Sequence, residues 1–184
     1  MNSDKIKQEI SKYTEWAEGT NCYDIALFRI LLVFEKYLIY KFISYSISGN
    51  PKSSVINNKI EFSDEEHLKH FLRGDRTYVE YLGKIENLSK HIFRNNPFTI
   101  ILDDSQYSPI YNELKVIRNQ IAHDSEESRH KFFKNCLNSK LTDKYLNVNE
   151  YLIRRTSNKD STSNYTRLVT GISKIVEFID DPFF

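Results

Sequence analysis

The sequence has 184 residues, of which 40% are hydrophobic, 14% aromatic and 28% charged, a composition typical of one globular domain with its own core. Its 26 basic and 25 acidic residues give a formal net charge of +1, which excludes a polycation that coats nucleic acid by bulk charge. Cys22 and Cys136 stand far apart and outside any paired motif. They argue against a disulfide framework and indicate a reducing, cytoplasmic location.

The two stretches that could target or anchor the chain do not have the required pattern. The first ten residues, MNSDKIKQEI, are charged where a signal peptide has an apolar core, so we expect no signal peptide. The apolar stretch at 25–47 is too short between charges to span a bilayer. It is interrupted by Arg29, Glu35, Lys36 and Lys41. We expect a buried helix there and no membrane contact.

Helical periodicity begins near the N-terminus and continues to the middle of the chain. A short first helix is predicted from Ile6, Ile10 and Tyr13, with Ser3 as its N-cap. A long helix from Asp24 or Tyr23 to about Tyr45 is apolar nearly all round, which predicts a central position. Residues 46–63 form a polar loop, with a short extended piece at 55–62. Ser63 then caps a short helix that ends near Leu72, and a further helix covers 78–92.

The second half continues this pattern. A helix at 106–122 carries an apolar stripe that consists of Ile110, Leu114, Ile117 and Ile121. Asp124 and Glu127 match a capping box that opens the next helix, which contains Phe132, Phe133 and Leu137. Residues 140–164 are polar and lean basic. The last helix carries Leu168, Ile172, Ile175 and Ile179. We therefore predict one all-α domain over residues 1–184, with five or six main helices.

Few catalytic motifs are present. The sequence has no glycine-rich phosphate loop, no G-x-S-x-G elbow and no C-x-x-C pair. Histidines lie beside acidic residues in two places, at His67 and His70 and at His123 and His130. Such clusters on charged helices are more often solvated surface than metal ligands. We expect no metal and no cofactor.

The informative segment is 115–128, KVIRNQIAHDSEES. On a helical wheel, Asn119 and His123 point nearly opposite to the apolar stripe, and Arg118 lies between the two faces. An Arg, an Asn and a His therefore gather at a helix C-terminus, away from the core. The simpler interpretation is a surface histidine near a helix end, where an imidazolium favours the helix dipole.

Glu35 is the second unusual residue. Every position three or four residues away is apolar: Leu31, Leu32, Leu38 and Ile39. A carboxylate enclosed in this way needs a cation or a hydrogen-bond donor. One interpretation leaves Glu35 exposed on an amphipathic edge, and the other pairs it with Arg118.

These residues resemble the HEPN domain family, α-helical bundles with the signature R-x4–6-H and commonly a polar residue after the Arg. ELKVIRNQIAHDSEES, at 113–128, is similar to the family phrase in which "IRN-x-IAH" ends one helix and an acidic cap opens the next. LFRILLVFEKYLIYKF, which contains Glu35, resembles the family's first long helix. The RiboL-PSP type is the most similar subgroup.

The resemblance implies a metal-independent endoribonuclease, a toxin or a phage-defence effector, that acts as a homodimer with both motifs at the interface. Arg118 and His123 would be catalytic, Asn119 supportive, and Glu35 the acid that holds Arg118. A cognate antitoxin or regulatory protein is a possible partner. Two alternatives stay open: a non-catalytic HEPN-fold module that binds a partner protein or a nucleotide, and an unrelated helical interaction domain.

The residue types suit RNA cleavage. RNA carries its own nucleophile, the 2′-OH, beside each phosphate. Histidine supplies a base or an acid near neutral pH, and arginine supplies a cationic fork for the phosphate oxygens. One histidine per chain cannot easily serve as both base and acid, which favours a dimer. We expect its interface along the outward face of the 106–122 helix, near Asn112, Asn119 and His123.

Overall fold

The computed structural model describes residues 3–47, 56–74, 79, 81–155 and 162–182, and within them it is all-α. The elements are α1 (Ser3–Thr20), α2 (Tyr23–Ser46), α4 (Glu65–Arg73), α5 (Tyr81–Ile92), α6 (Thr99–Leu102), α7 (Tyr107–His123), α8 (Glu126–Asn135), the 3-10 turn η1 (Leu141–Asp143), α9 (Val148–Ile153) and α10 (Asn164–Asp180). The β contacts in these ranges are isolated bridges. No helix in the described ranges is both long and apolar enough to cross a bilayer.

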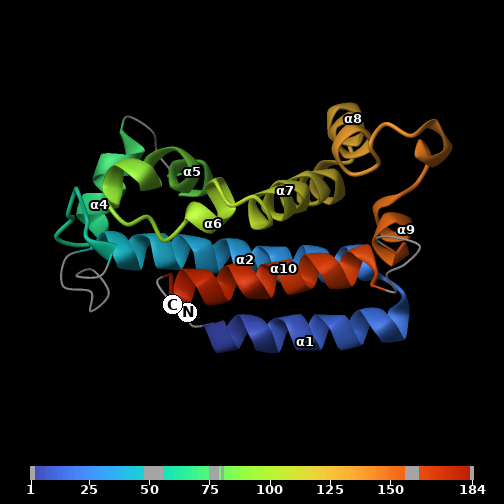
Figure 1. Ribbon diagram of the computed structural model, residues 1–184, viewed down its shortest axis with the longest axis horizontal. Coiled ribbons are helices and arrows are strands. Elements are labelled where there is room, and N and C mark those ends of the chain that lie inside the picture. The colour runs from blue at the N-terminus through green and yellow to red at the C-terminus, as the bar shows by residue number, and fades with distance from the viewer. Residues whose placement is uncertain (1–2, 48–55, 75–78, 80, 156–161, 183–184) are drawn as a thin grey trace.

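The helices are arranged around α2 (Figure 1). α1, α2 and α10 run side by side along the long axis, and α7 lies on the other side of α2 and α10. α4, α5 and α6 gather at one end of the molecule, while α8 and α9 lie at the other. α2 contacts α1, α4, α5, α7, α9 and α10, which confirms its predicted central position.

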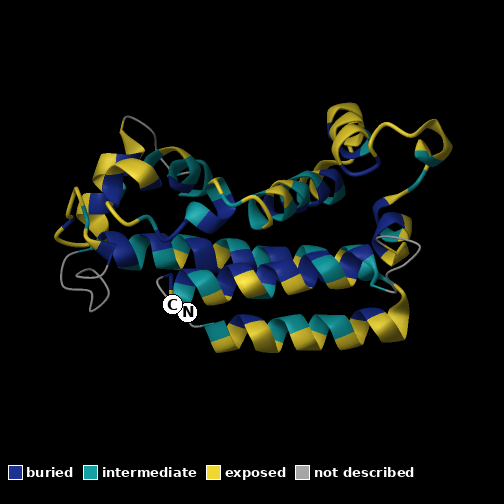
Figure 2. Cartoon of the chain, viewed as in Figure 1, coloured by how far each residue is buried: buried dark blue, intermediate teal, exposed yellow. Residues whose placement is uncertain are grey.

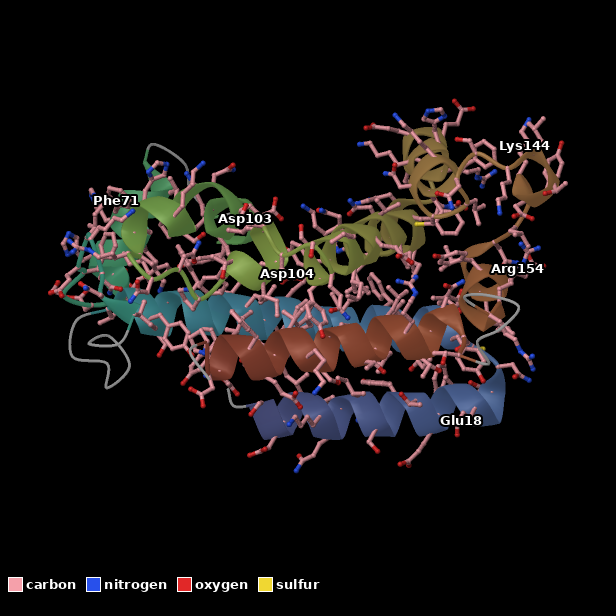
Figure 3. All side chains as sticks on the ribbon, viewed as in Figure 1. Glu18, Phe71, Asp103, Asp104, Lys144 and Arg154 are labelled. Atoms are coloured by element: carbon pink, nitrogen blue, oxygen red, sulfur yellow. The ribbon has the colours of Figure 1, made fainter. Side chains whose placement is uncertain are left out.

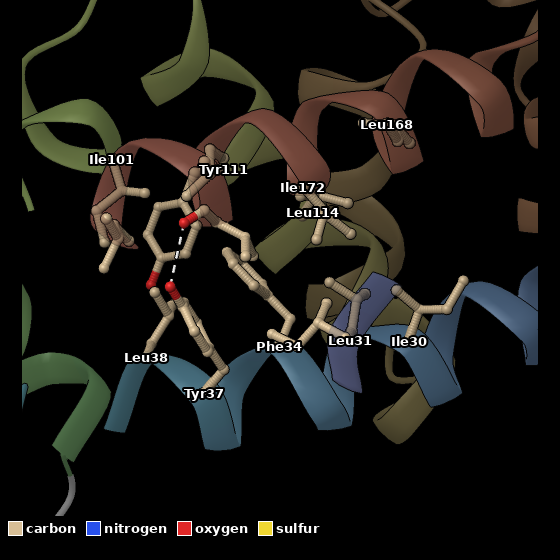
Figure 4. Packing of buried hydrophobic residues seen from close by; sticks show 14 of the residues in the cluster. Ile30, Leu31, Phe34, Tyr37, Leu38, Ile101, Tyr111, Leu114, Leu168 and Ile172 are labelled. Atoms are coloured by element: carbon tan, nitrogen blue, oxygen red, sulfur yellow. Dashed lines mark hydrogen bonds between the residues drawn. The ribbon is translucent and has the colours of Figure 1, made fainter. Parts of the chain in front are cut away.

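α2 is central because most of its sides are apolar. Its buried residues face several helices at once: Ala26, Leu27, Ile30, Leu31, Phe34, Tyr37, Leu38, Phe42 and Tyr45. Figure 4 shows Leu31 and Phe34 of α2 directed toward Tyr111 and Leu114 of α7. This contact joins the two helices that carry the predicted site residues.

Tyrosines of α2 attach the end of α10 to the core. The Tyr37 hydroxyl donates to Asp180 Oδ1 at 2.8 Å and lies 3.1 Å from the Val176 carbonyl. The Tyr45 hydroxyl donates to the Ile179 carbonyl at 2.7 Å. The stripe predicted for the last helix is confirmed, because all four of its members are buried: Leu168, Ile172, Ile175 and Ile179.

The N-terminal helix is longer than predicted. α1 has 18 residues and continues past Tyr13 to Thr20, where Ala17 is fully buried. Ser3 is already helical, so it is not the N-cap. Figure 2 shows the remaining surface of α1 as largely exposed. Polar residues on this outer surface weaken the apolar periodicity, and the prediction therefore ended too early.

The segment before α4 also differs from its prediction. The N-cap is Asp64, whose Oδ1 accepts from the His67 amide at 2.8 Å, and Ser63 is therefore not the cap. The extended piece predicted at 55–62 is reduced to bridges of Ile47 with Phe62 and of Asn58 with Phe93. Val55 and Tyr78, at the starts of two predicted elements, lie outside the described residues.

The polar region after α8, for which the sequence predicted no helix, contains η1 and α9. α9 begins at a capping box in which the Asn147 side chain and the Glu150 side chain each accept from the other residue's amide at 2.9 Å. Asn149 Oδ1 accepts from the Tyr23 amide at 2.8 Å. α2 has no local side-chain cap, so a residue 126 positions later performs that role.

Candidate active site

α7 carries the residues that the sequence singled out, and it begins at an acidic loop residue. The Asp104 carboxylate (labelled in Figure 3) accepts from the amides of Gln106 and Tyr107, both at 2.8 Å. These bonds satisfy amides that the first turn of a helix leaves without partners. α7 then runs to His123, one residue beyond the predicted end.

The two faces of α7 have the predicted polarity, with one change in the buried stripe. Asn112, Asn119 and His123 are exposed. The core side consists of Tyr111, Leu114, Ile117 and Gln120, whereas the expected members Ile110 and Ile121 are only half-buried. The polar groups therefore face away from this chain's core.

Arg118 and Glu35 lie together. Arg118 Nε is 3.3 Å from Glu35 Oε1, with the side chains 31% and 22% exposed respectively. Arg118 Nη1 donates to Asn119 Oδ1 at 3.4 Å. Glu35 is therefore neither enclosed by its apolar neighbours nor fully solvated. Its carboxylate forms an ion pair with the guanidinium beside α2, while part of the cation still reaches solvent.

His123 occupies the end of α7, where the chain reverses. Asp124 adopts the left-handed conformation, with φ 40° and ψ 37°, and its amide donates to the Gln120 carbonyl at 3.0 Å. α8 begins directly afterwards. Its capping box joins Ser125 and Ser128, so the predicted box of Asp124 and Glu127 is wrong. Asp124 cannot be the N-cap of α8 because its left-handed backbone ends α7.

Gln120 is a functional candidate that the sequence reasoning missed. Its Nε2 donates to Asp124 Oδ1 at 2.8 Å, and its Oε1 accepts from the Ser128 hydroxyl at 2.9 Å. These bonds join the end of α7 to the start of α8 and so position the turn beside His123. The sequence did hold a signal for this role. Gln120 lies three residues after Ile117, so its side-chain amide falls on the buried face of α7.

Two hollows adjoin the polar face of α7. The α5-side hollow has a volume of about 290 Å³ and is lined by Leu31, Phe34, Glu35, Leu82, Gly83, Glu86, Tyr111, Leu114, Lys115, Arg118 and Asn119. The α8-side hollow has a volume of about 190 Å³ and is lined by Val116, Asn119, His123, Ser125, Glu127, Ser128 and Lys131.

Asn119 lines both hollows, whereas Arg118 lines only the α5-side hollow and His123 only the α8-side hollow. The structure thus brings Arg118, Asn119 and Glu35 into direct contact and leaves His123 on the other side of Asn119. An anion that bridges the two hollows across Asn119 would meet a cation on one side and an imidazole on the other.

A second ionic group joins α7 to α9 and α10. Glu113 Oε1 accepts from Arg167 Nη2 at 2.7 Å and from the Tyr151 hydroxyl at 2.6 Å. Burial raises the pKa of Tyr151, and the nearby Glu113 charge raises it further. Tyr151 therefore stays protonated and donates. Burial likewise raises the pKa of the Cys136 thiol, which makes Cys136 a poor nucleophile.

The histidine clusters outside this site have ordinary contacts. His67 Nδ1 lies 3.3 Å from the Ser63 hydroxyl, and the His67 and Phe62 rings meet edge to face. His130 is exposed on α8. In the described part of the chain, no three His, Cys, Asp or Glu side chains are grouped closely enough to hold a metal ion.

Comparison with known proteins found no family model, no curated protein and no solved structure that matches this chain. The residues of the site and their geometry therefore carry the functional proposal.

Proposed function

We propose that this chain is a metal-independent endoribonuclease of HEPN type that acts as a toxin or a phage-defence effector. The supporting observation is the polar face of α7. On this face, Arg118 is paired with Glu35 in the α5-side hollow. Asn119 lines both this hollow and the α8-side hollow, which contains the exposed His123. A phosphodiester across Asn119 would contact all three groups.

The proposed reaction uses the 2′-OH of RNA as the nucleophile. The imidazole of His123 removes the 2′-OH proton, and O2′ attacks the adjacent phosphorus. The bond from phosphorus to O5′ then breaks, and an acid returns a proton to O5′. Arg118 stabilises the negative charge that develops on the non-bridging oxygens. The products are a 2′,3′-cyclic phosphate and a 5′-hydroxyl.

A homodimer would supply the second proton-transfer group. Each chain offers one histidine on this face, and its Asn112, Asn119 and His123 side chains are exposed and available to a second copy. A two-fold axis along the outward face of α7 would bring two copies of His123 to one cleft, so one acts as base and the other as acid.

One observation favours a second candidate, a HEPN-fold module that binds a partner protein or a nucleotide without cutting RNA. Both cations of the α5-side hollow are paired with carboxylates, Arg118 with Glu35 and Lys115 with Glu86. Such pairing lowers the local positive charge that attracts a phosphate chain. Arg118 and His123 line different hollows, and a module that only binds a ligand does not require them to share one.

Analysis of the RNA ends separates the two candidates. Purified protein is incubated with a mixed-sequence RNA, and the products are examined for 2′,3′-cyclic phosphates and 5′-hydroxyls. We expect both ends to appear. Absence of cleavage in a folded, dimeric preparation would favour the binding module, and products with 5′-phosphates would contradict the proposed chemistry.

A further inference from the structure

The α5-side hollow combines buried apolar residues with charged side chains, as small-ligand sites do. Its floor consists of Leu31, Phe34, Tyr111 and Leu114, all nearly fully buried and therefore already held by the core. Phe34 and Tyr111 meet edge to face, with ring centroids 6.5 Å apart. The volume of about 290 Å³ is close to the lower end of the roughly 300–1,000 Å³ of ligand pockets. It suits one ring system better than a peptide.

The rim of this hollow is charged. Lys115 and Arg118 lie three residues apart on α7, and both side chains reach solvent. Carboxylates of two other helices hold them: Lys115 Nζ is 2.7 Å from Glu86 Oε1, and Arg118 Nε is 3.3 Å from Glu35 Oε1. An apolar floor below two cations, each with a carboxylate beside it, matches a ligand with a flat ring, hydrogen-bond donors and an attached anion.

We propose that the α5-side hollow binds the nucleobase of the RNA residue next to the scissile phosphate. The base enters beside Leu82 and Gly83 of α5, which line the hollow. Its phosphate then lies at Asn119, beside Arg118. This proposal rests on the proposed ribonuclease function and extends it, because it makes the hollow the source of sequence preference at the cut.

Glu86 is the residue that we expect to distinguish between bases. It stands at the rim, where its Oε1 accepts from Lys115 Nζ at 2.7 Å and from the Tyr111 hydroxyl at 3.2 Å. A carboxylate only accepts hydrogen bonds, so Glu86 selects bases that present N–H donors toward it. Glutamine at this position offers donors as well, and the preference would change without a change in size.

Direct binding tests the hollow without depending on cleavage. The probes are the four nucleoside 3′-monophosphates, with ribose 5-phosphate and inorganic phosphate as ligands that lack a base, titrated against the full chain by calorimetry and NMR. We expect at least one nucleotide to bind ~10-fold tighter than ribose 5-phosphate. Equal binding of all six probes would overturn the proposal.

Variants locate the binding. Gly83→Leu adds a large side chain at a residue that lines the hollow. Its matched control is Gly19→Leu, a helical glycine whose added side chain meets open space on α1. We expect Gly83→Leu to weaken nucleotide binding ~10-fold or more and Gly19→Leu to leave it unchanged. Wild-type affinity in folded Gly83→Leu would exclude this hollow. If Gly83→Leu fails to fold, Glu86→Gln replaces it. An unchanged ranking of the four nucleotides in Glu86→Gln would then overturn the proposal.

Cleavage patterns separate the failure of this proposal from the failure of the nuclease. If the protein cuts RNA and Gly83→Leu keeps both nucleotide affinity and cut-site preference, the base site is wrong and the nuclease stands. If the protein cuts no RNA but binds nucleotides in a way that Gly83→Leu abolishes, the base-binding hollow stands and the nuclease proposal fails.

Discussion

Arg118 Nε lies 3.3 Å from Glu35 Oε1, across the contact between α7 and α2. The two residues are 83 positions apart in the chain, and each is only partly covered, 31% exposed for Arg118 and 22% for Glu35. The pair therefore has two effects. It neutralises a carboxylate that lies among leucines, and it holds a guanidinium at the edge of a hollow where an anion can reach it.

Coupling between Arg118 and Glu35 can be measured by a double-mutant cycle. Because water reaches both side chains, we expect Arg118→Ala to lower the free energy of unfolding by about 1 kcal/mol, below the ~3–5 kcal/mol of a fully buried pair. Adding Glu35→Gln recovers part of this stability but no cleavage, since the phosphate still lacks its cation. Urea unfolding of the four proteins gives the coupling energy, and strictly additive effects would contradict the pairing.

Replacement of His123 is expected to remove activity without unfolding the chain. His123→Ala lowers the rate of RNA cleavage by ~100-fold or more, because it removes the proposed proton-transfer group. The melting temperature stays close to wild type, since the side chain is exposed at the end of α7. His130→Ala, at an exposed histidine on α8, is the control and keeps full activity. Equal losses in both variants would refute the assignment of His123.

Cleavage is expected to require the 2′-OH and to survive chelation. The proposed nucleophile belongs to the substrate, so EDTA leaves the rate unchanged. A single 2′-O-methyl or 2′-deoxy group at the cut site blocks it, whereas the same group one residue away does not. Labelled oligonucleotides and gel analysis are sufficient. Loss of activity in EDTA that Mg²⁺ restores would rule out this mechanism.

The outward face of α7 is expected to form a homodimer interface. Light scattering gives twice the mass of one chain, and Asn112→Arg shifts the protein toward monomer because it places two like charges across a two-fold axis. Glu18→Arg, on the exposed side of α1 (Figure 3), leaves the mass unchanged.

Mixing Arg118→Ala and His123→Ala chains provides a second test of the dimer. If the cleft takes groups from both chains, the mixture regains part of the activity that each variant lacks alone. A monomer at micromolar concentration would argue against the shared cleft, because one chain offers a single histidine on this face.

Asp180 is expected to make stability depend on pH at the acid end. Burial by itself would raise its pKa, but hydrogen bonds from Lys41, Ser3 and Tyr37 hold the pKa below the ordinary 3.8. Since the folded pKa is the lower one, the charged form stabilises the protein above about pH 4. That contribution is lost as the pH falls through the folded value.

Asp180→Asn accordingly lowers the free energy of unfolding at pH 7 by about 1–3 kcal/mol. The difference from wild type shrinks as the pH falls below about 4, and it is smallest below the folded pKa of Asp180, where both side chains are neutral. Urea unfolding across this range measures it. Asp181→Asn, at the exposed neighbouring residue, is the control, and a pH-independent difference for Asp180→Asn would contradict the expectation.

The structure of the region between α8 and α9 could not be predicted from the sequence. Its apolar residues are few, and two of them, Leu141 and Tyr145, are 80% and 90% exposed. Lys144, between them, lies at the outer tip of this segment in Figure 3. Arg154 Nη1 meets Asp143 Oδ1 at 2.9 Å and closes the segment toward α9. Periodicity could not predict this contact, because it joins two polar residues across an irregular turn.

The sequence by itself determined the all-α class, the central position of α2, the buried stripe of α10 and the outward direction of Asn119 and His123. These follow from local periodicity, since a helix repeats every 3.6 residues and sorts apolar from polar side chains. Only the tertiary structure decided which cation meets Glu35, that Asn149 caps α2, that Gln120 is buried, and that Arg118 and His123 line different hollows. Such contacts depend on how distant helices pack, which no local spacing encodes.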